Sequence, residues 1–98
     1  MSEQGGLTFL GELARVVEDR KRNPVEGSYT AYLFSRGVDK IAKKTGEEAV
    51  EVVIASKNDD KADLTREIAD LTYHLLVLME EKGVTLADVC TELKRRHK

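Results

Sequence analysis

The chain has 98 residues, of which 41% are hydrophobic and 35% are charged, and its 16 basic and 18 acidic side chains leave a net charge of −2. This composition is typical of one globular domain, expected over residues 1–98, and the nearly balanced charge gives no reason to expect nucleic acid or an anionic membrane as a partner. The lone cysteine, Cys90, excludes an intramolecular disulfide and a cysteine-rich zinc site, and the lack of a leader or of an apolar run near the roughly 18 residues of a membrane span favours a cytoplasmic location.

Apolar residues recur at the helical period, and no stretch alternates as a strand would, which predicts an all-α fold. The first helix is expected over residues 7–22, because Pro24 and Gly27 interrupt the chain after it. A short helix over residues 29–36 follows, and it should end at Gly37.

Three further helices are predicted in the remainder of the chain, which gives four main helices and one short one. The first runs over about residues 38–57, with a bend or restart at Gly46. The second follows a polar turn and stops near Gly83, and the third begins at a capping box formed by Thr85 and Asp88. The apolar residues expected to face inward from the last helix are Leu86, Val89, Cys90 and Leu93.

Five carboxylates interrupt the apolar runs of the two central helices. They are Glu47, Glu48 and Glu51 in "GEEAVE", and Glu67 and Asp70 in "EIAD". At 3.6 residues per turn, apolar side chains border both acidic stripes, so neither stripe lies on an ordinary solvated face. Like charges three or four residues apart destabilise a helix, whereas elsewhere an acid is followed four residues later by a base, as in Glu18–Arg22.

For each acid taken singly, a solvated helix former is an alternative, and Thr45 with Glu48 could form a simple capping box. For the set, a bound divalent cation explains the pattern better, because it would neutralise acids that converge from two helices. Oxygen ligands favour Mg²⁺, with Mn²⁺ as the alternative, and the absence of a Glu-x-x-His pair argues against a di-iron bundle. His74 is expected to face the bundle or to stand behind the ligands.

Basic residues lie just upstream of the first acidic cluster, on the same segment. A magnesium-type cluster beside lysines is what a polyphosphate substrate requires, although a solvated basic face is the alternative for "DKIAKK". No P-loop is present, which argues against a kinase or a GTPase. The basic residues are Lys40, Lys43 and Lys44, and Arg36 lies before them in the chain.

Longer motifs resemble one family. "EGSYTAYLFSRG", "KIAKKTGEEAVEVVIASK" and "REIADLTYHLLVLMEEKG" are similar to phosphoribosyl-ATP pyrophosphohydrolases, within the MazG-type all-α nucleoside triphosphate pyrophosphohydrolases, and the resemblance covers about residues 7–97. It implies Mg²⁺-dependent hydrolysis of 1-(5-phosphoribosyl)-ATP between its α- and β-phosphates, giving phosphoribosyl-AMP and diphosphate, in histidine biosynthesis. Many relatives are fused to a zinc-dependent cyclohydrolase, and the length and cysteine count here predict the stand-alone enzyme.

The resemblance also implies a MazG-like bundle completed by dimerisation. A homodimer would fit the apolar residues on the far sides of the acidic helices, such as Val52, Ala69 and Leu76. The position of Tyr32 is often basic in relatives, so no phosphate contact is expected there.

The resemblance assigns roles to individual residues. The implied metal ligands are Glu48, Glu51, Glu67 and Asp70. Glu47 and Glu48 are the implied catalytic residues, with Glu47 either a further ligand or the group that orients the attacking water. The implied substrate-binding residues are Ser28, Tyr29, Thr30, Arg36, Lys40, Lys43 and Lys44, of which the first three would contact the phosphoribosyl part.

Two alternatives to this function remain open at this point. One is a general pyrophosphohydrolase of ordinary or damaged nucleoside triphosphates, which would use the same acids. The other is a non-catalytic helical dimerisation module, which predicts no magnesium binding and no loss of function on Glu51→Gln.

Overall fold

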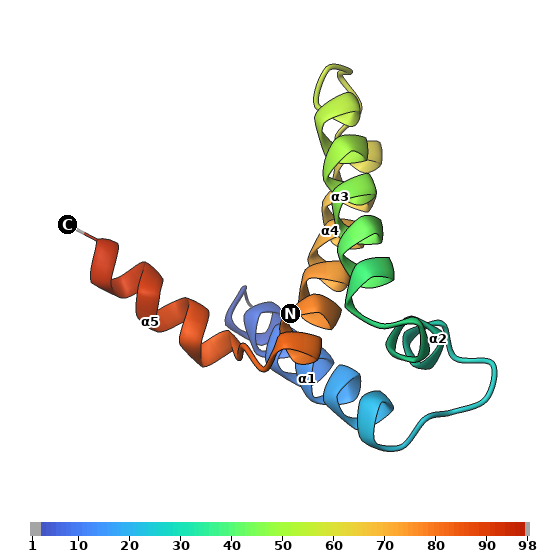
Figure 1. Ribbon diagram of the computed structural model, residues 1–98. Helices are drawn as coiled ribbons and strands as arrows, with labels where there is room; N and C mark the ends of the chain where they lie inside the picture. Colours follow the sequence, from blue (N-terminus) through green and yellow to red (C-terminus); the bar gives the residue numbers. More distant parts are fainter. Residues whose placement is uncertain (1–2, 98) are drawn as a thin grey trace.

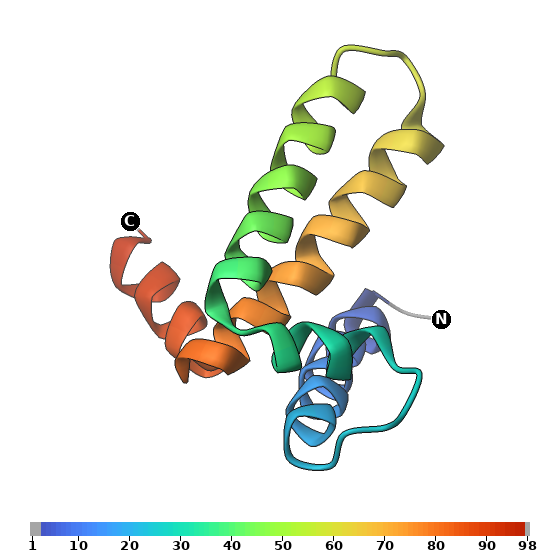
Figure 2. The ribbon, with the colours of Figure 1, turned by 45° about the vertical axis from the view of Figure 1, so that its right-hand side comes forward.

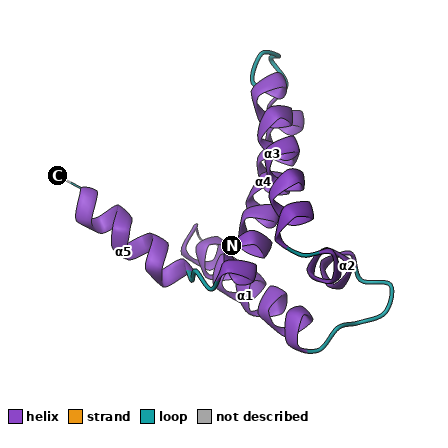
Figure 3. Ribbon diagram, viewed as in Figure 1, coloured by secondary structure: helices purple, strands orange, loops and turns teal. Residues whose placement is uncertain are grey.

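A computed structural model describes residues 3–97, which form five helices and contain no strand (Figures 1 and 3). The predicted all-α fold is therefore confirmed. The helices are α1 (Glu3–Arg22), α2 (Tyr29–Arg36), α3 (Val38–Ala55), α4 (Lys61–Lys82) and α5 (Leu86–Arg96). α1 begins four residues earlier than its apolar period predicts, and α3 runs through Gly46 as one continuous helix, without the expected restart.

Local interactions account for the helix ends. The Asp60 side chain accepts a hydrogen bond from the backbone N–H of Asp63 at 3.0 Å and so caps α4. Gly83 ends α4 with φ of 73°, a left-handed conformation that glycine adopts without a steric penalty. The predicted capping box of Thr85 and Asp88 is present at the start of α5.

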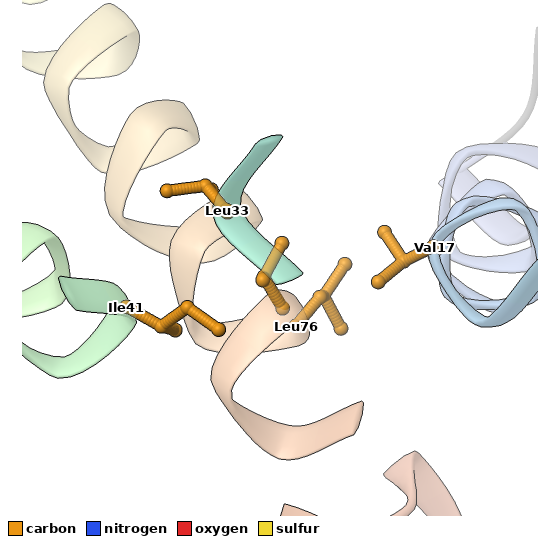
Figure 4. Packing of buried hydrophobic residues seen from close by; sticks show 5 residues of the cluster. Val17, Leu33, Ile41 and Leu76 are labelled. Carbon is orange, nitrogen blue, oxygen red and sulfur yellow. The ribbon is translucent and has the colours of Figure 1, made fainter. Parts of the chain in front are cut away.

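α3 and α4 lie side by side as an antiparallel hairpin, and α1 and α2 pack at its open end (Figure 2). The buried core lies at that end, where Val17 of α1, Leu33 of α2 and Ile41 of α3 meet the α4 side chains Leu76 and Val77 (Figure 4). The other end of the hairpin extends beyond the helices that could cover it (Figure 2). Its outer face is therefore more exposed than the core end.

The core predicts a sharp contrast between two adjacent valines of α1. Val17 is 1% exposed and Val16 is 47% exposed. We expect Val17→Ala to lower the free energy of unfolding by about 2–3 kcal/mol, because it removes buried methyl groups and leaves a cavity. Val16→Ala should change it by less than about 0.5 kcal/mol. Urea denaturation at one fixed protein concentration measures both, and equal effects would contradict the position of the core.

Two sequence expectations about apolar residues are wrong. Leu76 was expected to face another subunit, but it is buried in the core of its own chain. The inward side expected for α5 is not buried either, since Cys90 is exposed and Leu93 is 62% exposed. Only Leu86 contacts the core, and α5 projects away from the other helices (Figures 1 and 2). The apolar side chains of α5 do lie on one side of the helix as predicted, but no other helix among residues 3–97 covers that side.

Within residues 3–97, none of the helices is both long and apolar enough to cross a membrane.

Candidate functional site

The two central helices bring three of the predicted acids together. Glu48 comes from α3, and Glu67 and Asp70 lie one turn apart on α4. One carboxylate oxygen from each lies within 4.8 Å of the others. Because α3 and α4 are the most closely packed pair of helices, this convergence follows directly from the hairpin.

The charges in this group of three are only partly compensated. Partial burial and the neighbouring carboxylates of Asp70 and Glu51 raise the pKa of Glu67 above its usual value. On the other helix, the Lys44 ammonium lies 3.9 Å from a carboxylate oxygen of Glu48 and offsets part of the charge. Three carboxylates that offer only oxygen ligands, around a spot where negative charge is disfavoured, fit a hard divalent cation. The residues therefore fit a metal-ion site.

The two other acids of the motif lie beside this group. Glu51 is exposed on α3, and its charge contributes to the raised pKa of Glu67, so it is near the group without belonging to it. Glu47 is also exposed, and its carboxylate lies 3.9 Å from the Lys44 ammonium. The structure thus brings together three of the four predicted ligands and leaves Glu47 on the solvent side.

The alternative of a simple capping box at Thr45 is excluded. α3 is continuous through this position, so no helix begins there. The Thr45 hydroxyl instead donates a hydrogen bond to the Ile41 carbonyl oxygen at 2.9 Å, within the same helix. Glu48 therefore has no capping role.

The predicted phosphate-binding residues lie on the side of the acids nearer α2. Lys40, Lys44 and Glu48 occupy successive turns on one face of α3. Within the described part of the chain, Lys40 and Lys43 form no ion pair, whereas Lys44 pairs with the acids. Arg36 is exposed in the last turn of α2, just before α3 begins. Positive side chains are therefore available at this end of the acidic group.

The side chains of Ser28, Tyr29 and Thr30 in "GSYT" form hydrogen bonds with other residues of the chain. Ser28 caps α2 by accepting a hydrogen bond from the backbone N–H of Ala31 at 3.2 Å. The Thr30 and Tyr73 hydroxyls are hydrogen-bonded to each other, which ties α2 to α4. The Tyr29 hydroxyl lies 2.9 Å from Nε2 of His74. These contacts orient the first turn of α2 against the helix that carries two of the acids.

His74 is buried behind the acidic group, as expected for a histidine that is not a ligand. Its Nδ1 lies 2.7 Å from the carbonyl oxygen of Asp70 and donates a hydrogen bond to it, so Nε2 accepts from the Tyr29 hydroxyl. The sequence pattern places Asp70 and His74 one turn apart but gives no sign of the contact with Tyr29. That link connects "GSYT" to a predicted metal ligand through one imidazole.

Residues 10–97 match the family described as phosphoribosyl-ATP pyrophosphohydrolase. Over 89 residues, or 91% of this chain and 81% of the relative, the chain is 56% identical to the phosphoribosyl-ATP pyrophosphatase of Clostridium acetobutylicum. It is 60% identical over 88 residues to the phosphoribosyl-ATP pyrophosphatase of Listeria monocytogenes, which covers 90% of this chain and 84% of the relative.

A longer relative matches equally well. The histidine biosynthesis bifunctional protein HisIE of Caldanaerobacter subterraneus is 57% identical over 95 residues, which is 97% of this chain. The chain spans only 46% of the length of that relative.

Proposed function

The chain belongs to the phosphoribosyl-ATP pyrophosphohydrolase family of histidine biosynthesis, as its motifs predicted, and we propose that it hydrolyses 1-(5-phosphoribosyl)-ATP to phosphoribosyl-AMP and diphosphate. The observation that carries the proposal is the convergence of Glu48, Glu67 and Asp70 in a chain that matches this family over residues 10–97. The same ground supports treating residues 1–98 as one domain of this kind, with a cytoplasmic location, because the substrate belongs to amino-acid biosynthesis.

We propose that Mg²⁺, or Mn²⁺ as the alternative, is held by the group of three acids, with Glu51 as the fourth ligand. When bound, such an ion supplies positive charge to the phosphoryl oxygens and increases the acidity of a water. The protein itself supplies oxygen ligands from two helices that are already packed together. The half-buried position of Glu48 and Glu67 keeps these ligands in place before the substrate arrives.

The remaining charged residues have separate tasks in this proposal. Lys40, Lys43 and Lys44 would bind the phosphates, because ammonium groups pair with phosphate oxygens and lie one to two turns from the acids. Glu47 lies outside the group of three and would accept the proton of the attacking water. The water oxygen then bonds to phosphorus, the α–β phosphoanhydride bond breaks, and diphosphate leaves with the bonding electron pair.

We further propose a homodimer, on the evidence of the open shape of the chain. Its accessible surface is 7325 Å², whereas a compact monomer of 11.0 kDa exposes about 5,600 Å². Its radius of gyration is 14.6 Å, against about 12.6 Å for a compact domain of this length. The excess of about 1,700 Å² is comparable to the area that one protomer buries in an obligate dimer.

The exposed end of the hairpin is the best candidate for this interface. Val50, Val53 and Ile54 of α3 and Ile68 of α4 are all exposed there. A cluster of aliphatic side chains of this kind typically marks a surface that another protein covers. The face lies on the same helices as the acids, which would place the active sites near the subunit interface.

A pyrophosphate-release assay tests the function directly. We expect release from phosphoribosyl-ATP in the presence of Mg²⁺, no release after EDTA, and much slower release from ATP or a panel of deoxynucleoside triphosphates. Faster release from the deoxynucleotides would instead assign a general nucleotide pyrophosphohydrolase. No release from any of these compounds would favour the non-catalytic dimerisation module.

A further inference from the structure

A pocket of about 650 Å³ lies between α2 and the loop that joins it to α1, within the size range of small-molecule sites. That loop passes outside α2 before entering it (Figure 1). We name this cavity the tyrosine pocket, and its lining includes Val25, Glu26, Tyr29, Tyr32 and Ser35. None of the roles assigned to the acids and lysines uses it.

Two tyrosine rings give the pocket a flat aromatic surface. The Tyr29 and Tyr32 ring centroids are 6.3 Å apart with an interplanar angle of 26°, and Tyr73 continues the row at 6.2 Å from Tyr29. Tyr29 and Tyr32 are 44% and 46% exposed. The hydrogen bond to the buried His74 holds Tyr29 in place, so the surface is formed before any ligand binds. Such faces stack against planar rings, and the bases of nucleotides, purines among them, are planar rings.

The charge of the tyrosine pocket disfavours a phosphate and favours an uncharged ring. Its lining contains no lysine or arginine, and Glu26 is its one charged residue. A carboxylate repels phosphate but accepts hydrogen bonds from the N–H groups of a base. The tyrosine pocket therefore suits the base of a nucleotide, whereas the lysines of α3 and the acids of α3 and α4 suit its phosphates.

The tyrosine pocket is linked by hydrogen bonds to α4, the helix that carries Glu67 and Asp70. Tyr29 lines the pocket, and His74, which holds its hydroxyl, donates a hydrogen bond to the carbonyl of Asp70. Partial burial, followed by the charges of Tyr73 and Glu48, raises the pKa of Tyr29. One nucleotide could therefore occupy the tyrosine pocket with its base and the acidic group with its phosphates.

We propose that the tyrosine pocket binds the purine ring of the substrate, stacked on the exposed face formed by Tyr29 and Tyr32, while the phosphates lie at the lysines of α3 and the group of three acids on α3 and α4. This proposal rests on the proposed function, because it places one part of that substrate. It makes Tyr32 a specificity-determining residue rather than a phosphate ligand. It also gives "GSYT" a second task, which is to present Tyr29 to the base.

A binding experiment tests the tyrosine pocket without any hydrolysis. The three tyrosines of the chain all belong to this aromatic row, so the ring signals of tyrosine-labelled protein in NMR report on it alone. We expect adenosine, without metal, to shift the Tyr29 and Tyr32 signals and ribose 5-phosphate to leave them unchanged. Shifts with ribose 5-phosphate but not with adenosine would overturn the proposal. Adenosine has no phosphoanhydride, so this result stands even if no pyrophosphate is ever released.

Kinetics of Tyr32 variants provide the second test. We expect Tyr32→Leu to raise the KM for phosphoribosyl-ATP by about tenfold or more and to change kcat by less than about threefold, because stacking is lost but the acids remain. Tyr32→Phe, which keeps the ring, should behave as the unchanged protein does. Phe9→Ala, at an exposed aromatic residue of α1, is the matched control. An unchanged KM in Tyr32→Leu with normal thermal stability would contradict a stacking role.

Discussion

Glu48→Gln is expected to reduce Mg²⁺-dependent pyrophosphate release by about 100-fold or more, while the metal-free protein stays folded and becomes no less stable. Glutamine keeps the shape of the side chain but removes its charge, which is what holds a hard cation. In the metal-free protein the same change relieves repulsion from Glu67 and Asp70, whose carboxylates lie within 4.8 Å. Lys44 keeps an acidic partner in Glu47.

Two measurements separate a ligand from a structural residue in this variant. Pyrophosphate release measures the activity. Thermal denaturation with and without Mg²⁺ measures how much the ion raises the melting temperature, and this rise should largely disappear in Glu48→Gln. Glu12→Gln, at an exposed acid of α1, is the control and should retain both properties. Activity within a few fold of the unchanged protein would remove Glu48 from the site. A loss of activity together with a lower melting temperature in EDTA would instead indicate a structural role.

Ile54→Glu is expected to separate the proposed homodimer into monomers, raising the dissociation constant by about 100-fold or more. Ile54 is 54% exposed on the apolar face at the end of the hairpin, beside Val50 and Val53 in the turns of α3. A carboxylate placed there would lose its hydration when a second chain covers it. In the isolated chain the residue is exposed, so the fold itself should tolerate the change.

Light scattering coupled to size-exclusion chromatography measures this effect over a range of protein concentrations. Val16→Glu is the matched control, because Val16 is a similarly exposed aliphatic residue on α1, away from the hairpin end. The unchanged protein and the control should elute as dimers, and Ile54→Glu as a monomer. A monomeric unchanged protein would refute the dimer, and a dimeric Ile54→Glu would place the interface elsewhere, with the exposed side of α5 as the next surface to test.

The candidate site shows where residue patterns are sufficient and where they are not. Glu67 and Asp70 are one turn apart on one helix, so their proximity follows from helix geometry. Glu48 joins them only because α3 and α4 pack in a particular register. The resemblance of the motif to a known family predicted this grouping, and the packing of α3 against α4 is its physical cause. Tyr29 and His74 are 45 residues apart, and no pattern of neighbouring residues in the sequence predicts their hydrogen bond.

The sequence by itself determined the all-α class and most helix ends, because these depend on interactions between residues a few positions apart. Capping at Thr85 and the glycine stop at Gly83 are of this kind. The tertiary structure alone decided which apolar residues are buried, so that Leu76 is in the core and Leu93 is exposed although both fit a helical stripe. A periodic stripe shows that a helix has an apolar side, but burial depends on whether another element reaches that side, and this is set by how distant segments pack.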